Sequence, residues 1–248
     1  MDGSKPVNSV AKALRVLHAL ARPDGPHRLG EIAESSGVPK ATTHRVLAIL
    51  IEEGYAAADG EGRYGSGNQL RALSALVLAD DAVGIDAVLR ALQQRLGQTV
   101  HLAVPSGDYA TYTHKVDPGH AYRIASDIGT PLPLHTSAAG KALLAHLPQS
   151  EADAILDRTG LPARTPRTHT DRAALAEELA RIRTDGYATD YEESDDSICS
   201  IAAPVLDADG TPVGAVSVSA LTFLVAEDQL STFAPAVQQA ALDVSRRL

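Results

Sequence analysis

The amino-acid sequence predicts an α+β protein, in which a small helical N-terminal domain precedes a larger domain built on an antiparallel sheet. Three observations support this fold class. Residues 1–68 hold three helical patterns and then a hairpin pattern, residues 69–84 form one Ala- and Leu-rich helical pattern, and residues 85–248 alternate strand patterns and turns between helices. We therefore expect domains of 1–68 and 85–248 joined by a linker helix of 69–84, which suits a length of 248 residues.

The N-terminal domain begins with a helical pattern over residues 9–21. The stretch from Leu29 to Tyr55 then predicts two helices joined by a tight turn, because Gly37 ends the first helix and Pro39 suits the first turn of the second. Between Thr43 and Leu50, apolar or small side chains recur at helical spacing, so one side of the second helix belongs to a core. A helix pair of this kind is typical of a helix-turn-helix, although any helical hairpin with a polar surface remains an alternative.

Polar side chains near the start of the second helix would face outward, where a recognition helix meets base edges. We expect this DNA-binding face to comprise Lys40, Ala41, Thr42, His44 and Arg45. A hairpin follows, with its turn at Asp59–Gly62, and three helices before a hairpin make a winged helix-turn-helix. Arg28 and Arg63 are then placed to contact the DNA backbone, and the order of elements favours DNA binding over the plain hairpin.

The charge distribution permits DNA binding only at a local basic face. Residues 1–68 carry equal numbers of basic and acidic side chains, so the net charge of −9 lies in the rest of the chain. An acidic C-terminal domain repels phosphate, and non-specific affinity should be modest. We therefore expect a dimer to supply a second DNA-binding copy.

The C-terminal domain should consist of antiparallel strands with helices at both of its ends, and we expect helices to cover one face of the sheet. Strands are predicted at 99–104, 110–116, 122–126, 198–206 and 213–220, and helices at 85–96, from about 136, at 151–157, at 171–185 and at 226–246.

Three motifs in this domain, taken with the winged helix, carry a family resemblance. They are PLPLHTSAAGKALLA, the segment DYEESDDS, and the strand pair ICSIAAPVLDADGTPVGAVSVSA. With them the chain resembles the IclR family of bacterial transcription regulators, from residue 9 to the C-terminus. The resemblance implies a winged helix, a linker helix, a GAF-like ligand-sensing domain, and dimers or tetramers bound to a double-stranded DNA operator.

The resemblance also implies an effector site, which falls on Ile124, Leu132, Ala138, Ala139, Asp190, Ile198, Ser200, Ser217 and Ser219. The chemistry of these residues is coherent. Two of the serines, Ser217 and Ser219, are two apart on one strand and share a face. Ala138 and Ala139 would lie in the first turn of a helix, where small side chains leave backbone N–H groups open to an anion. We therefore expect a small organic acid. Asp190 either binds this ligand or caps backbone, and the sequence does not decide between them.

Three positions depart from the family pattern. Ala41 stands where Ser is frequent in the recognition helix, which removes one hydroxyl from the DNA-binding face. Ser197 and Ser200 stand where Gly and Cys are usual before Ile201. The identity of the effector therefore cannot be taken from a relative.

Other residues suggest sites that we set aside. Cys199 has no histidine and third orienting group close to it in the sequence, so a buried strand cysteine is favoured over a catalytic one and no catalytic residue is expected. The histidines lack zinc-site spacing, so we expect no structural metal site and no cofactor. Ser137, Gly140 and Lys141 lack the spacing of a phosphate loop, and we expect Lys141 on a helix surface.

Two classes of function remain. The first is a ligand-responsive transcription regulator, and the second is an enzyme that acts on a small organic acid and carries an N-terminal interaction module. The enzyme needs acid, base or nucleophile groups in one pocket, and the sequence offers none. With one cysteine, no signal-peptide pattern and no membrane-length apolar stretch, we expect a cytoplasmic protein without membrane contact.

Overall fold

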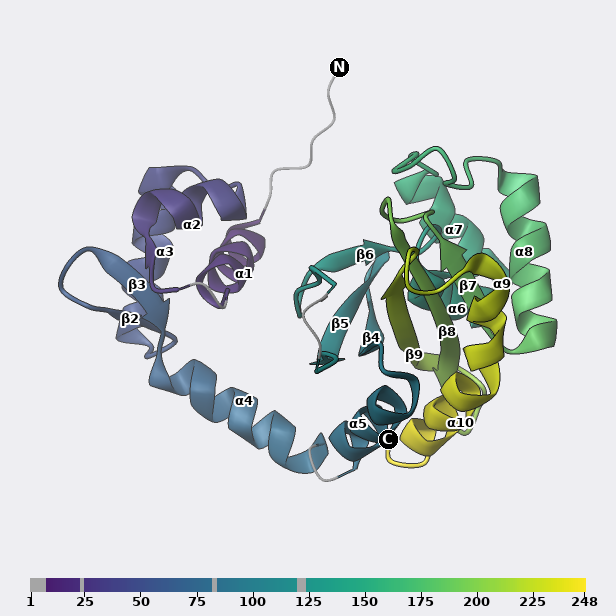
Figure 1. The fold of residues 1–248 in the computed structure, drawn as a ribbon. Coiled ribbons are helices and arrows are strands. Elements are labelled where there is room, and N and C mark those ends of the chain that lie inside the picture. Colours follow the sequence, from purple (N-terminus) through teal and green to yellow (C-terminus); the bar gives the residue numbers. More distant parts are fainter. Residues whose placement is uncertain (1–7, 23–24, 82–83, 120–123) are drawn as a thin grey trace, which may run out of the picture. The chain divides into compact units, whose positions relative to one another are not determined.

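A computed structural model describes residues 8–22, 25–81, 84–119 and 124–248 of the chain. These fall into two compact units, residues 1–80 and 81–248, which we describe separately. The predicted division at 68/69 and 84/85, with a linker between, stays a prediction. Figure 1 follows the chain through both units.

The N-terminal unit is a winged helix-turn-helix. Its elements are α1 (Ser9–Leu20), β1 (His27–Arg28), α2 (Leu29–Ser36), α3 (Lys40–Glu52), β2 (Ala56–Ala58), β3 (Arg63–Ser66) and α4 (Asn68–Asp81). The three helices α1 to α3 bury one aliphatic core in which Val16, Leu20, Ile32 and Leu47 are almost fully enclosed. The small sheet has the order β1-β3-β2, and the two-residue strand β1 is an element that the hairpin pattern did not predict.

The turn between α2 and α3 is fixed by local chemistry. Gly37 ends α2 with φ of 62°, a conformation that a residue without Cβ adopts at no steric cost. Pro39 occupies the position before α3, and fully buried Thr43 donates its hydroxyl hydrogen to the Val38 carbonyl at 3.0 Å. This hydrogen bond holds the start of α3 against the turn.

The C-terminal unit is a six-stranded antiparallel sheet with helices packed on it. The sheet order is β6-β5-β4-β9-β8-β7. Its strands are β4 (Thr99–Ser106), β5 (Tyr109–Val116), β6 (Pro131–Pro133), β7 (Ala188–Tyr191), β8 (Ile198–Leu206) and β9 (Pro212–Leu221). Its helices are α5 (Ile85–Leu96), α6 (Ala138–His146), α7 (Gln149–Thr159), α8 (Arg172–Asp185), α9 (Glu227–Leu230) and α10 (Ala234–Ser245).

Both faces of this sheet are covered, so the expectation of one covered face is wrong. Successive residues of β8, such as Ile201 and Ala202, enter different cores because neighbouring side chains of a strand point to opposite faces. One core includes α5 and α10, and the other includes α6, α7 and α8 (Figure 1). The strands are near-continuous apolar runs without the alternation of a half-exposed sheet, so the sequence did contain the signal for two covered faces.

Two predicted elements differ from the structure. Residues 124–126 are not a strand, and 122–123 lie outside the described residues; the strand that pairs with β5 is instead β6, at Pro131–Pro133. The predicted helix of 226–246 is divided into α9, one 3-10 turn at Ser231–Phe233, and α10. Pro235 in the first turn of α10 explains the division, since proline cannot continue the hydrogen bonds of a preceding turn.

Candidate functional site

The predicted DNA-binding face lies at the start of α3. Lys40, Ala41, His44 and Arg45 are exposed, and Thr42 is half-buried. On the opposite side of the same helix, Thr43 and Leu47 are buried in the core. The helix therefore presents its polar side to solvent, as the spacing predicted.

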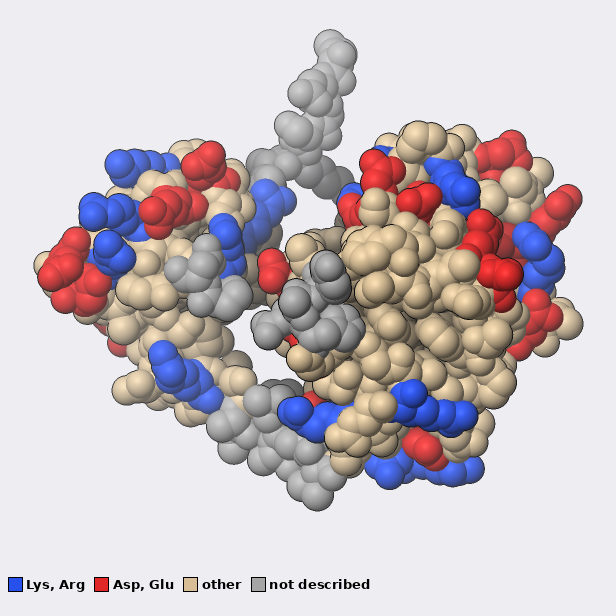
Figure 2. Space-filling view, in the orientation of Figure 1, with Lys and Arg blue, Asp and Glu red and all other residues tan. Residues whose placement is uncertain are grey.

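The two arginines predicted to contact the DNA backbone lie beside each other. Arg28 on β1 and Arg63 on β3 are direct partners in the antiparallel pair, and both are exposed. Directly opposed residues share one side of a sheet, so both guanidinium groups are available to one phosphate-bearing strand. The visible surface of this unit mixes blue and red side chains without a broad basic area (Figure 2).

In the C-terminal unit, a cavity of about 320 Å³ lies against the sheet face that faces α6. Six of the nine predicted effector residues line it: Ile124, Leu132, Asp190, Ile198, Ser200 and Ser219. They come from four strands and one loop that are far apart in the sequence, and the fold brings them to one place. We call this space the effector cavity, after the predicted effector residues that line it.

The other three predicted residues are not among those that line the effector cavity. Ala138 and Ala139 form the first turn of α6 and are buried in the core between that helix and the sheet. Ser217 is buried two residues before Ser219 on β9. These three residues are therefore buried in the core and do not line the cavity.

Sequence reasoning missed several residues that line the cavity, above all Tyr112, Arg164 and Ser137. Ser137 caps α6 by accepting a hydrogen bond from the Gly140 N–H at 3.0 Å. Arg164, in the loop before α8, donates to the Ser194 carbonyl at 2.8 Å and to Asp195 at 3.2 Å. The cap was visible in the sequence as a serine before an apolar helix, whereas nothing near Arg164 indicated its position.

Tyr112 stacks on His101, with ring centroids 4.1 Å apart and an angle of 18° between the planes. Both rings are buried, so burial raises the pKa of Tyr112 to about 12 and lowers the pKa of His101 to about 3. The nearby ammonium of Lys115 lowers the pKa of His101 further. Both rings are thus neutral near pH 7, and the imidazole shares a hydrogen bond of 2.8 Å with Ser126.

Asp190 both faces the effector cavity and caps backbone. Its Oδ1 accepts hydrogen bonds from the N–H groups of Glu193 at 2.8 Å and Ser194 at 3.3 Å, and its Oδ2 accepts from the Ser200 hydroxyl at 3.3 Å. Burial raises the pKa of this carboxyl, against the effect of these donors. The two roles that the sequence left open for Asp190 are therefore compatible.

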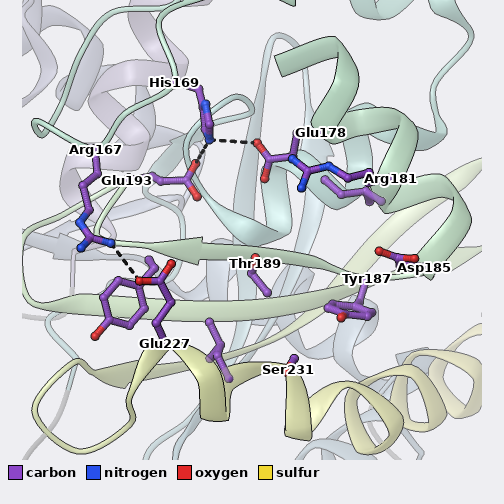
Figure 3. Close-up of a pocket in the computed structure, with 13 residues that line it drawn as sticks. Arg167, His169, Glu178, Arg181, Asp185, Tyr187, Thr189, Glu193, Glu227 and Ser231 are labelled. Carbon is purple, nitrogen blue, oxygen red and sulfur yellow. Dashed lines mark hydrogen bonds and ion pairs between the residues drawn. The ribbon is translucent and has the colours of Figure 1, made fainter. Parts of the chain in front are cut away.

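A second cavity, of about 570 Å³, lies at the edge strand β7 and is shown in Figure 3. It is lined by Arg167, His169, Glu178, Arg181, Ile182, Asp185, Tyr187, Thr189, Tyr191, Glu193, Glu227, Leu230 and Ser231. Odd-numbered residues of β7 face this space, while Asp190 faces the effector cavity. Strand β7 and the residues after it thus separate the two cavities.

Lys141 lies fully buried beside the second cavity, so its predicted place on a helix surface is wrong. Its ammonium is 2.7 Å from Glu178 Oε1 and 2.6 Å from Glu193 Oε2, and its side chain has no exposed area. Helix α6 is buried on all sides, and the lysine can enter the interior only because two carboxylates neutralise it.

Cys199 is buried in β8, as predicted. Its Sγ is 3.8 Å from the Val225 carbonyl, and burial raises the pKa of the thiol to about 11. The thiolate that a nucleophile requires is therefore disfavoured near pH 7.

Comparison with protein families matches both parts of the chain. Residues 9–60 match the IclR helix-turn-helix domain, and residues 72–246 match the C-terminal domain of bacterial IclR transcriptional regulators. The chain belongs to the IclR family. Its winged helix and GAF-like sheet domain confirm the predicted fold class.

Similar proteins support this membership over the full length of the chain. The transcriptional regulator XynR of Escherichia coli is 33% identical, with 98% of this chain and 97% of XynR covered. The repressor IclR of Escherichia coli is 32% identical, with 96% and 89% covered. The crystal structure of a regulator from Alicyclobacillus acidocaldarius matches with a TM-score of 0.81 at 31% identity and covers 98% and 99% of the two chains.

A second solved structure shares the fold at lower identity. It is an IclR homologue from Microbacterium hydrocarbonoxydans in complex with 4-hydroxybenzoate, with a TM-score of 0.81, 22% identity, and 97% and 99% of the two chains covered.

This family member is a DNA-binding transcription regulator with a C-terminal effector domain. The relatives named above are regulators and not enzymes, which decides between the two classes of function that the sequence left open. Within the described residues, no helix combines the length and apolar character needed to cross a bilayer.

Proposed function

We propose that this regulator reads an operator in the DNA major groove with the start of α3 and senses a small carboxylate-bearing metabolite in the effector cavity. One observation carries the proposal: six residues predicted as effector contacts line a single cavity of about 320 Å³. The regulator would work in the cytoplasm as a homodimer or tetramer.

The DNA-binding part rests on the polar side chains near the start of α3. Lys40, Thr42, His44 and Arg45 lie within reach of base edges if α3 enters the groove, while Arg28 and Arg63 bind the backbone. Ala41 contributes a methyl group only. A bidentate arginine contact to guanine discriminates by about 1–3 kcal/mol, so Arg45 should be a main source of specificity.

The first experiment measures DNA affinity by fluorescence anisotropy on duplexes selected from a random library with the wild-type protein. Arg45→Ala should weaken binding by about 5- to 150-fold, which corresponds to that energy range. Arg15→Ala, which removes an exposed arginine of α1 in the same unit, is the matched control and should bind nearly as wild type. Equal affinities of wild type and Arg45→Ala would refute the recognition-helix assignment.

Two features favour an anion in the effector cavity. Helix α6 begins directly after the lining residue Ser137, and a helix N-terminus stabilises negative charge. Arg164 also lines the cavity, where its positive charge is partly offset by Asp195 at 3.2 Å. Hydroxyl groups of Ser200 and Ser219 and the carboxyl of Asp190 can bind polar groups at the other end of a ligand. The homologue that holds 4-hydroxybenzoate makes such an acid a reasonable first probe.

The second experiment compares 4-hydroxybenzoate with 4-hydroxybenzamide in a thermal-shift assay on the full-length protein. Other small organic acids are tested beside their amides, since a ligand that binds the folded state raises the melting temperature. At least one acid should raise it and its neutral amide should not. Ser200→Ala should reduce the shift, whereas Ser106→Ala, at the exposed end of β4, should not. If amides stabilise as well as acids, the carboxylate proposal fails while the DNA-binding assignment stands.

A further inference from the structure

Three metal-binding side chains meet at the second cavity, which the proposed function does not use. His169 comes from the loop before α8, Glu178 from α8, and Glu193 from the segment between β7 and β8. Figure 3 shows these side chains pointing toward one another at the wall of the cavity. One ligand atom from each lies within 4.8 Å of the other two.

The separations suit a small cation. Zinc binds imidazole nitrogen and carboxylate oxygen at about 2.0–2.2 Å in a tetrahedral arrangement, which places ligand atoms about 3.3–3.5 Å apart. His169 Nε2 is 3.3 Å from Glu178 Oε2 and 3.9 Å from Glu193 Oε2. Small side-chain rotations would bring all three atoms to binding distance of one ion.

Lys141, which is not among the residues that line the second cavity, holds the two carboxylates. Its ammonium contacts Glu178 Oε1 at 2.7 Å and both oxygens of Glu193 at 2.7 and 2.6 Å. Glu178 is only 9% exposed, and its Oε2 is buried and accepts no hydrogen bond from any described residue; its contact is the ion pair with His169 Nε2 at 3.3 Å. An unsatisfied buried carboxylate oxygen beside an imidazole is an available metal ligand.

The charges also leave room for a second cation. Two carboxylates face one lysine, so the buried cluster carries more negative than positive side chains. Arg167, which lines the same cavity, pairs with Glu227 at 3.2 Å and Glu192 at 3.6 Å.

We propose that His169, Glu178 and Glu193 form a binding site for one divalent cation of the zinc class, with Lys141 holding both carboxylates in place. The mixture of one imidazole and two carboxylates favours zinc or cobalt over magnesium, which prefers oxygen ligands and retains its water. The open cavity leaves a fourth position for water or a ligand group. Spacing along the sequence gave no sign of this site because its three ligands come from separate elements.

The test uses full-length protein without a histidine tag, stripped with a chelator and titrated with Zn²⁺ in a calorimeter. We expect one equivalent per chain, and Co²⁺ should give visible absorption bands that one equivalent of Zn²⁺ removes. His169→Ala should weaken Zn²⁺ binding at least about tenfold, because even the loss of a residue that only supports a metal ligand lowers metal affinity by about that much. His169 is 37% exposed in its side chain, so its replacement should leave the fold intact.

His18→Ala is the matched control, because His18 is an exposed histidine of α1 that contributes nothing to the cluster. It should bind Zn²⁺ as the wild type does. Absence of Zn²⁺ binding, unchanged affinity in His169→Ala, or equal losses in both variants would overturn the proposal. X-ray absorption of the zinc-loaded wild type needs no variant: nitrogen and oxygen ligands with one imidazole support the site, and a sulfur ligand contradicts it.

Discussion

At the scale of single residues, the interior of the C-terminal unit tolerates ionisable groups by two different means. His101 is kept neutral, because burial against Tyr112 excludes its charged form. Lys141 is kept charged, because Glu178 and Glu193 surround it. The stability of the unit therefore depends on pH through His101 and on two carboxylate partners through Lys141. The two effects can be tested separately.

The pKa of His101 gives a pH dependence with a defined sign. It falls from 6.5 in the unfolded chain to about 3 in the folded protein, so the unfolded chain binds more protons between these values. The free energy of unfolding should therefore decrease as pH falls from about 6.5 toward 3, by up to about 1.4 kcal/mol per unit from this residue. Urea unfolding between pH 6.5 and 4.5 measures the slope, which His101→Gln should reduce and His18→Gln should leave unchanged.

Removing the charge of Lys141 should be severe. Lys141→Met keeps an unbranched chain in the buried position but leaves two carboxylates without their cation. Breaking a buried ion pair in this way costs about 3–5 kcal/mol of stability. Chemical unfolding followed by circular dichroism gives the value, and Lys12→Met on α1 is a comparison that should change stability by less than about 1 kcal/mol. If Lys141→Met also lost less than about 1 kcal/mol of stability, the ion-pair cluster would not be formed.

At the scale of elements, the Gly-Lys-Ala-Leu-Leu-Ala helix has a packing reason for its glycine. A Cβ added to Gly140 would lie 2.6 Å from the Leu134 Cα and 2.7 Å from the Pro133 carbonyl oxygen. Helix α6 therefore approaches the end of β6 more closely than any side chain allows. This contact positions Ser137 and Leu132 at the effector cavity.

Gly140→Ala should destabilise the protein by about 1–3 kcal/mol, because the clash is with backbone and cannot be relieved by a rotamer change. Gly30→Ala on α2 is the matched control, since a Cβ there meets nothing within 4 Å. Alanine is the better helix former by about 0.5–1 kcal/mol, so the control should be neutral or stabilising. Differential scanning calorimetry separates the two outcomes. A Gly140→Ala protein as stable as the wild type would contradict the close approach.

Elements with strong local signals were predictable, and those defined by distant contacts were not. The turn at Gly37 and Pro39, the strands around Ile201 and Val216, and the cap of α8 at Asp171 follow from local residue chemistry. Strand β1 exists only because Arg28 pairs with Arg63, some 35 residues along the chain. Likewise, the pattern of α6 marks an apolar helix, but the carboxylates that bury Lys141 come from α8 and from the segment after β7.

The effector cavity shows the same limit. Family resemblance located six of its lining residues, whereas composition and periodicity alone would have located none. Tyr112 and Arg164 escaped because neither belongs to a motif and both depend on the fold for their position. The exposed residues of α3 were predictable from spacing alone, since a helix with one apolar side must present its other side to solvent.

At the scale of the whole molecule, DNA recognition has to overcome an unfavourable charge. The net charge is −9, and the N-terminal residues 1–68 contribute none of it. A single unit with a few cationic contacts gives weak binding that depends strongly on salt. Tight binding therefore requires two copies on one operator, which is the reason we propose a dimer.

Operator spacing tests this requirement. If two copies bind two half-sites on one face of DNA, inserting about half a helical turn, or 5 base pairs, between the half-sites should abolish tight binding. Inserting about a full turn of 10 base pairs should restore much of it. Gel-shift titration of the three duplexes at one salt concentration is sufficient. Equal affinity for all three would show that each unit binds independently.

The segment from Asp190 to Asp195 has a consequence for regulation. The effector cavity is lined by Asp190, Ser194 and Asp195, whereas the second cavity is lined by Glu193, which lies between them in the sequence. The Asp190 carboxylate accepts a hydrogen bond from the Glu193 N–H. A ligand in one cavity that moves this segment therefore changes the positions of the residues that bind a ligand in the other cavity. Thermodynamic linkage makes the influence mutual: if a cation strengthens effector binding by some factor, the effector strengthens cation binding by the same factor. The regulator would then respond to the coincidence of two chemical signals through six residues of shared backbone.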